Sequence, residues 1–344
     1  MREISRGRLG ATIATAALFA VAGAPTAWAG VTPGDGTRET DTPKGDAKPD
    51  GTLSATAGGV VYDRSRNGSG SAVGPLAPVG NWTPPPCWYA PKYSPAEFKA
   101  YVEPIWSVDS TGAAWDASQR DRYVNGKPYT NFNLDKAGKG YWWDSYVDTS
   151  YPPGWDACNK PYFWVDKGAP PPADVPEAIT PEILAKLAYA EIRVPATQVT
   201  LKPDGTSKVN LPTWAWLDKT DFRPVSVTAS VPALGISATT TASPVSLKLE
   251  PGTADASLYP ASGECPINAD GSIGTPYEAG SADKAPPCGV TYRRATSGAP
   301  YNLKATVTWK IHWVGTGTPG GDLPDGTFGH DQQVTVQEIQ AVNR

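Results

Sequence analysis

Histidines are the first residues to consider for acid–base or metal chemistry, and this chain has two in 344 residues. His312 alternates with apolar residues, on the same side as Lys310, and is interpreted as a solvated surface side chain. His330 precedes Asp331 in a glycine-rich stretch without a neighbouring nucleophile, and is interpreted as part of a loop. A zinc site usually needs three or four protein ligands. The sequence therefore predicts no catalytic residue, no cofactor and no metal site.

Aspartates among aromatic residues suggest a second chemistry, because paired carboxylates hydrolyse glycosidic bonds. The candidates are Asp116, Asp121, Asp144, Asp148 and Asp156. Their spacing does not select two partners, so a secreted hydrolase stays an alternative. The chain has neither a G-x-S-x-G nucleophile motif nor a phosphate-binding loop.

Four tryptophans are candidates for contact with a ligand. Trp142 and Trp143 are adjacent, so in a strand they point to opposite faces, which allows at least one of them to face solvent. The competing interpretation, which we favour, leaves both half-buried in an irregular aromatic core. Trp214 and Trp216 share one face of a strand. For this pair we favour core packing, with sugar stacking as the second interpretation.

The four cysteines are an even number, without C-x-x-C spacing, which favours disulfides over a metal site. Three pairings are possible. Sequence order and the domain division favour Cys87–Cys158 and Cys265–Cys288.

The first residues have the three parts of a secretory signal: Arg2, Arg6 and Arg8, an apolar run over 9–24, and the A-x-A motif at 27–29. The run is shorter than the roughly 20 residues that a spanning helix needs. We predict a secreted, extracellular protein, with association with the cell wall as a second location, and no transmembrane segment after cleavage. The net charge of −4 becomes about −6 without residues 1–29, which argues against nucleic acid as a partner.

Composition divides the chain into five segments. They are a signal peptide (1–29), a disordered Gly/Ser/Thr/Pro-rich tether (30–80), an aromatic-rich disulfide module (81–167), a proline-rich linker with a helix (168–197) and a β-sandwich domain (198–344). Within the tether, residues 60–62 are predicted to form one short strand at most.

A capping box at Ser94–Glu97 predicts a helix from 95 to about 103. A second helix is predicted from Pro181, ending at Pro195.

Strict alternation predicts antiparallel strands with one solvated face. It is clear at 225–231 and 245–249, and longest at 301–313, where the length predicts a bend or bulge near the middle. The fold class is therefore mainly β: an antiparallel β-sandwich preceded by a small aromatic, disulfide-containing α+β module and a linker helix.

Two resemblances support this fold. Residues 290–292 and 298–308 resemble the C-terminal half of a polycystic-kidney-disease (PKD) repeat, although 247–252 lack its acidic turn. Residues 210–216, the PVSVTASV run from Pro224 and the TVTW strand at 306–309 are similar to uncharacterised secreted actinobacterial proteins. These resemblances imply that the sandwich is immunoglobulin/PKD-like and that the protein is extracellular, but they imply no catalytic site.

The sequence thus predicts a secreted, non-enzymatic scaffold or binding protein whose partner is a protein or glycan of the cell envelope. The alternatives are a carbohydrate-binding protein with exposed tryptophans and the hydrolase described above.

Overall fold

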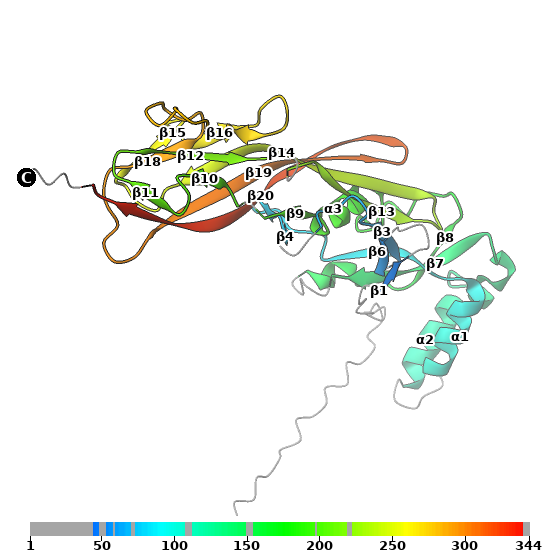
Figure 1. Cartoon of the computed structure of the whole chain (residues 1–344). Helices are drawn as coiled ribbons and strands as arrows, with labels where there is room; N and C mark the ends of the chain where they lie inside the picture. The colour runs from blue at the N-terminus through cyan, green and yellow to red at the C-terminus, as the bar shows by residue number, and fades with distance from the viewer. Residues whose placement is uncertain are drawn as a thin grey trace, which may run out of the picture.

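Three long strands run through the fold: β14 (Ile236–Glu250), β19 (Tyr301–Gly315) and β20 (Thr318–Gln337) (Figure 1). The structure is a computed structural model. It describes residues 59–69, 73–106, 112–148, 154–196, 198–218 and 222–339, together with the strand backbone at 44–47 and 53–57. The predicted signal peptide lies outside the described residues.

Alternation along β19 determines how this sheet packs. Leu303, Ala305, Val307, Trp309 and Ile311 are completely buried, while the residues between them are exposed or half-buried. The predicted bulge is confirmed, because the register against β20 shifts between Trp309 and Ile311. The register of β14 against β19 also shifts, between Pro244 and Ser246. A proline supplies no N–H to a sheet, so an irregularity is expected there.

These three strands belong to a ten-stranded sheet of order β1-β2-β3-β13-β14-β19-β20-β11, in which β16 also pairs with β14 and β5 with β20. The other members are β1 (Lys44–Ala47), β2 (Leu53–Ala57), β3 (Val60–Asp63), β5 (Ala77–Pro78), β11 (Thr206–Lys208), β13 (Val225–Val231) and β16 (Glu264–Pro266).

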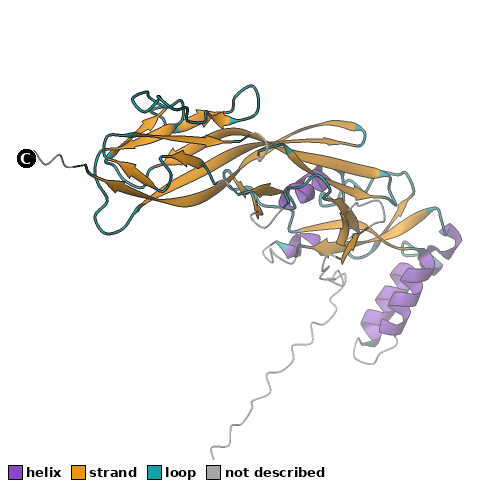
Figure 2. Ribbon diagram, in the orientation of Figure 1, coloured by secondary structure: helices purple, strands orange, loops and turns teal. Residues whose placement is uncertain are grey.

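A second sheet covers part of the apolar face of the long strands. It contains β10 (Thr200–Lys202), β12 (Pro212–Leu217), β15 (Ala256–Tyr259), β17 (Ile273–Gly274) and β18 (Gly289–Tyr292). Ala215 and Leu217 of this sheet share one apolar core with Leu247 and Val307 of the large sheet. The predicted mainly β fold with a sandwich is confirmed (Figure 2).

Helix α3 (Pro181–Ala190) covers another part of that apolar face, contacting β13, β14 and β19. Thr240 of β14 donates a hydrogen bond to the carbonyl oxygen of Ala185 (2.8 Å). The helix was predicted to continue to Pro195, which is wrong: it ends at Ala190, and β9 (Arg193–Pro195) pairs with β4 (Val73–Pro75). It is also part of the core, because Leu184 and Ala185 are completely buried.

The aromatic module has a three-stranded sheet of β6 (Cys87–Tyr93), β7 (Gly140–Val147) and β8 (Phe163–Asp166). Its helices are α1 (Pro95–Ile105), α2 (Ala113–Tyr123), η1 (Asn131–Lys136) and η2 (Trp155–Cys158). The predicted capping box of α1 is confirmed, and the helix includes Pro104 rather than stopping before it. The predicted disulfides Cys87–Cys158 and Cys265–Cys288 are both present.

The predicted tether differs from the structure over 59–69 and 73–80. Val60 is completely buried and Tyr62 is 3 % exposed, because β3 pairs with β13 in the large sheet. Two large apolar side chains inserted into a shared core offset the ordering entropy of a segment that is otherwise polar. The ordered part of the chain therefore begins before residue 81.

Candidate functional site

Trp142 and Trp143 point to opposite faces of β7 as predicted, but neither face is open to solvent. Trp142 is 0 % and Trp143 1 % exposed, and the indole N–H of Trp142 donates to the carbonyl oxygen of Phe132 (3.0 Å). Trp142 packs in the aromatic cluster with Phe98, while Trp143 belongs to the large core. Burial of both side chains, the interpretation that we favoured, agrees with these exposures, and neither is open to a ligand because other residues cover both faces of β7.

Trp214 and Trp216 have a different environment. Their neighbours Ala215 and Leu217 point into the sandwich core, so both tryptophans face the other side of β12. Trp214 is buried beneath Tyr277, with ring centres 5.8 Å apart, whereas Trp216 is half-buried and lines a groove. We favoured packing in the sandwich core for this pair. Trp216 differs from this interpretation, because it lines the groove instead.

None of the five aspartates lines the groove described below. Asp144 is buried and pairs with Lys92, with 3.2 Å between Nζ and Oδ2. Asp121 accepts hydrogen bonds from Asn125 and Lys127 on the surface. Within the described part of the chain, no group of three or more histidine, cysteine, aspartate or glutamate side chains is placed to hold a metal ion.

The two histidines are exposed, and His330 lies in β20 rather than in the predicted loop. His312 Nδ1 lies 2.7 Å from Asp322 Oδ1 across the β19–β20 pair. Hydrogen bonds from His312 and then Lys310 lower the pKa of the Asp322 carboxyl. Thr241 is opposite His312 in register, but no hydrogen bond joins these two described side chains.

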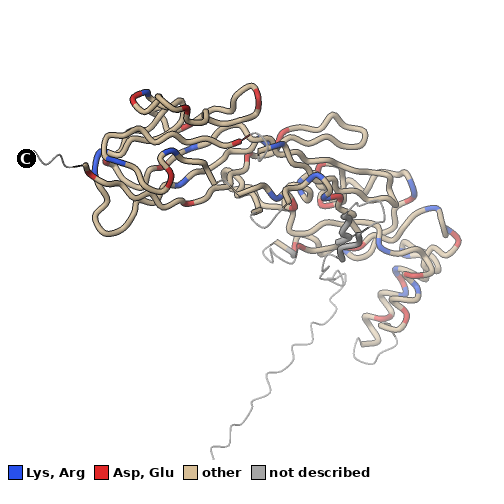
Figure 3. Tube along the Cα trace, viewed as in Figure 1, with Lys and Arg blue, Asp and Glu red and all other residues tan. Residues whose placement is uncertain are grey.

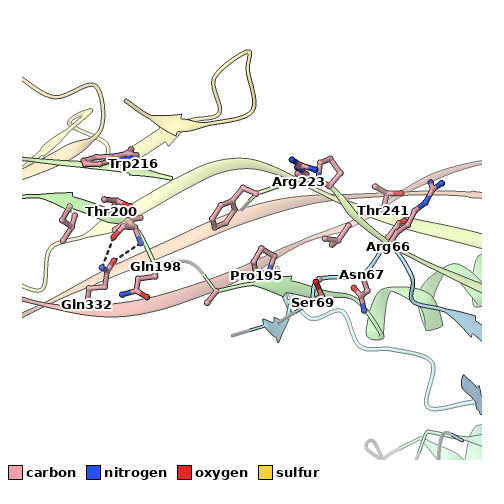
Figure 4. A pocket seen from close by; sticks show the side chains of 18 of the residues that line it. Arg66, Asn67, Ser69, Pro195, Gln198, Thr200, Trp216, Arg223, Thr241 and Gln332 are labelled. Carbon is pink, nitrogen blue, oxygen red and sulfur yellow. Dashed lines mark hydrogen bonds between the residues drawn. The ribbon is translucent and has the colours of Figure 1, made fainter. Parts of the chain in front are cut away.

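A groove of about 1580 Å³ lies where the two sheets, β9 and the residues after β3 meet (Figure 4). Its walls come from 65–69, from the β9–β10 segment, from Trp216 of β12, from 222–226 leading into β13, and from Thr241, Tyr277 and Gln332. Segments more than 200 residues apart in the sequence thus form one concave surface.

Hydrogen bonds fix two of these walls. The Asn67 side chain donates to the carbonyl oxygen of Glu191 (2.9 Å) and accepts from the Arg193 N–H (2.8 Å). Gln332 similarly binds both backbone groups of Val199, at 3.0 and 2.9 Å. Gly68 allows close approach, since a Cβ there would lie 2.4 Å from the Arg193 carbonyl oxygen. The groove is thus largely preformed.

The charges lining the groove are mainly positive. Arg66, Lys202 and Arg223 contribute three cations and Asp204 one carboxylate. The three cations are exposed, and none of them forms an ion pair within the described part of the chain. Over the molecule as a whole, basic and acidic residues are interspersed and the net charge is −4 (Figure 3). The groove is therefore a local positive region on an acidic protein.

Sequence reasoning placed Trp216 among the candidates but missed the other groove residues. Arg66 and Asn67 fall in the segment that composition assigned to a tether. The VVY run at 60–62 was the available signal, because a strand there brings the following residues against the sandwich.

Comparisons of the chain with protein-family models, curated proteins and solved structures find no match. In the part of the chain that the structure describes, no helix has the length and apolar character needed to cross a membrane.

Proposed function

We propose that this protein is secreted and acts as a non-enzymatic binding protein of the cell envelope, with its ligand held in the groove beside Trp216. The single observation that carries the proposal is the groove itself: a large concavity with walls fixed by hydrogen bonds, which is the usual form of a binding site.

The composition of the groove supports binding rather than catalysis. Its described lining includes exposed cations, three aromatic residues (Trp216, Phe222 and Tyr277), and the single carboxylate of Asp204. Hydrolysis of a glycoside usually needs two facing carboxylates. The location is supported by the signal-like residues 1–29 and by two disulfides, which persist in oxidising compartments.

The test is retention of the chain lacking residues 1–29 on purified cell-wall material. We expect saturable retention that falls at least about tenfold in Trp216→Ala, since aromatic anchors dominate many interfaces. The matched control is Trp164→Ala, another half-buried tryptophan, which lies on β8 outside the groove. Retention that is absent, or equal in wild type and Trp216→Ala, would refute this proposal.

A further inference from the structure

The groove has an aromatic region and a cationic region. In Figure 4, Trp216 lies toward one end, while Arg66 and Arg223 lie toward the other. The third cation, Lys202, is opposite Trp214 in the β10–β12 register, which places it on the aromatic side. A ligand that contacts both regions must therefore be extended rather than compact.

The groups available to a ligand differ from the groups that build the walls. The amides of Asn67 and Gln332 are already used by backbone atoms, so they hold the groove in shape. The side chains of Arg66 and Arg223 are exposed, and no acidic partner neutralises them within the described residues. Guanidinium groups bind carboxylates and phosphates in a bidentate manner.

The aromatic region indicates which kind of molecule bears the carboxylate or phosphate groups. A tryptophan face is a broad apolar surface beside a polar N–H, and it matches the flat C–H face of a sugar ring. Trp216 is half-buried, so part of its ring remains accessible in the groove. The net charge of the protein is negative and does not attract an anion. The three cations of the groove exceed its one carboxylate by two charges, and this local excess attracts an anion.

From this arrangement we infer that the groove binds an extended anionic glycan, with a sugar ring on Trp216 and its carboxylate or phosphate groups at Arg66 and Arg223. This inference rests on the proposed function and specifies its ligand class. Carboxylate and phosphate share the chemistry that an arginine recognises, so separate probes must distinguish them.

The direct test is calorimetric titration with polygalacturonate fragments as the carboxylate probe, poly(glycerol phosphate) as the phosphate probe and cellohexaose as the neutral probe. We expect at least one anionic probe to bind tenfold or more tighter than cellohexaose. That advantage should shrink as salt increases, because exposed charges are screened. The double variant Arg66→Gln/Arg223→Gln should lose the advantage, whereas Trp216→Ala should weaken every glycan that binds.

The control double variant is Lys248→Gln/Arg294→Gln, which removes two exposed cations that do not line the groove. It should bind like the wild type. Circular dichroism of each variant checks that the fold is retained. An oligothymidylate and a polyglutamate serve as contrasting probes, because stacking with cations also suits single-stranded nucleic acid. Equal or tighter binding of either would overturn the inference.

Cell-wall retention separates this inference from the proposed function. If retention depends on Trp216 but not on Arg66 and Arg223, and neither anionic probe binds, the anionic glycan is refuted while the binding function stands. If retention does not depend on Trp216, the binding function fails as well.

Discussion

At the scale of single residues, the buried pair of Lys92 and Asp144 joins β6 to β7. Their side chains are 6 % and 0 % exposed, and the Lys92 ammonium lies 4.9 Å from the Tyr146 ring centre. Removing one member of a buried pair leaves a charge that has lost both water and its counterion. The ion pair with Lys92 accounts for the position of Asp144 among aromatic residues.

We predict that Lys92→Met lowers the free energy of unfolding by about 3–5 kcal/mol. The surface pair of Lys127 and Asp121 supplies the control, because their side chains are 71 % and 45 % exposed. Lys127→Met should change stability by about 0–1 kcal/mol. Urea unfolding at neutral pH measures both variants. Similar small losses in the two would show that the Lys92 pair is not an important stabilising contact.

The alternation of residues along a strand does not determine whether a tryptophan in that strand is buried. Adjacent Trp142 and Trp143 must face opposite sides of a strand, and they do. The sequence carries no signal that both sides are covered, one by α1 and η1 and the other by the large core. Trp216 has the opposite outcome, because the side of β12 opposite the sandwich core contributes to the groove.

At the scale of elements, helix α1 shows how far local chemistry can predict structure. Ser94 Oγ accepts a hydrogen bond from the Glu97 N–H (3.4 Å), and Glu97 accepts one from the Ser94 N–H (2.8 Å). These contacts involve residues three apart, so the sequence alone locates the start of the helix. Its end is less determined, because Pro104 falls in the last turn and Trp106 still donates to the Val102 carbonyl oxygen.

We predict that Ser94→Ala lowers the free energy of unfolding by about 1 kcal/mol at pH 7. Hydrogen bonds from Ser94 lower the pKa of the Glu97 carboxyl. The stabilisation linked to that shift is present above the ordinary glutamate pKa and is lost as the pH falls through the lowered value. The difference between wild type and Ser94→Ala should therefore shrink in acid.

Urea unfolding at pH 7 and at about pH 2, below the usual range for glutamate, tests this prediction. Ser118→Ala is the control, because Ser118 Oγ donates to the Trp115 carbonyl oxygen on the exposed surface of α2 and caps no helix end. A loss that is larger at pH 2 than at pH 7 would contradict the role given to Glu97.

At the scale of the whole molecule, the segment after residue 58 is part of the folded body. Val60 and Tyr62 are buried, Asp63 to Val61 pair with β13, and Arg64 forms an ion pair with Glu191 (2.6 Å) next to α3. The same segment contributes Arg66 and Asn67 to the groove. The same stretch of chain therefore takes part in the fold and lines the proposed binding groove.

We predict that a chain beginning at residue 81 is less stable and aggregates more than one beginning at residue 44. Removal of β3 uncovers the edge of β13 and the apolar surface under Val60 and Tyr62, and an exposed edge pairs with other chains. Thermal unfolding and size-exclusion chromatography compare the two chains. Equal stability and a monomeric shorter chain would show that β3 is dispensable.

The sequence by itself determined the features that depend on neighbours in the chain or on their period. These are the capping box at Ser94, the alternation at 301–313 and the mainly β class, while sequence order only favoured the disulfide pairing that the structure contains. Only the tertiary structure decided the environment of Trp142 and Trp216, the packing of α3 on the sheet and the existence of the groove. The physical reason is that burial and concavity are made by segments far apart in the chain, such as Arg66, Trp216 and Gln332, and no local pattern records which segments meet.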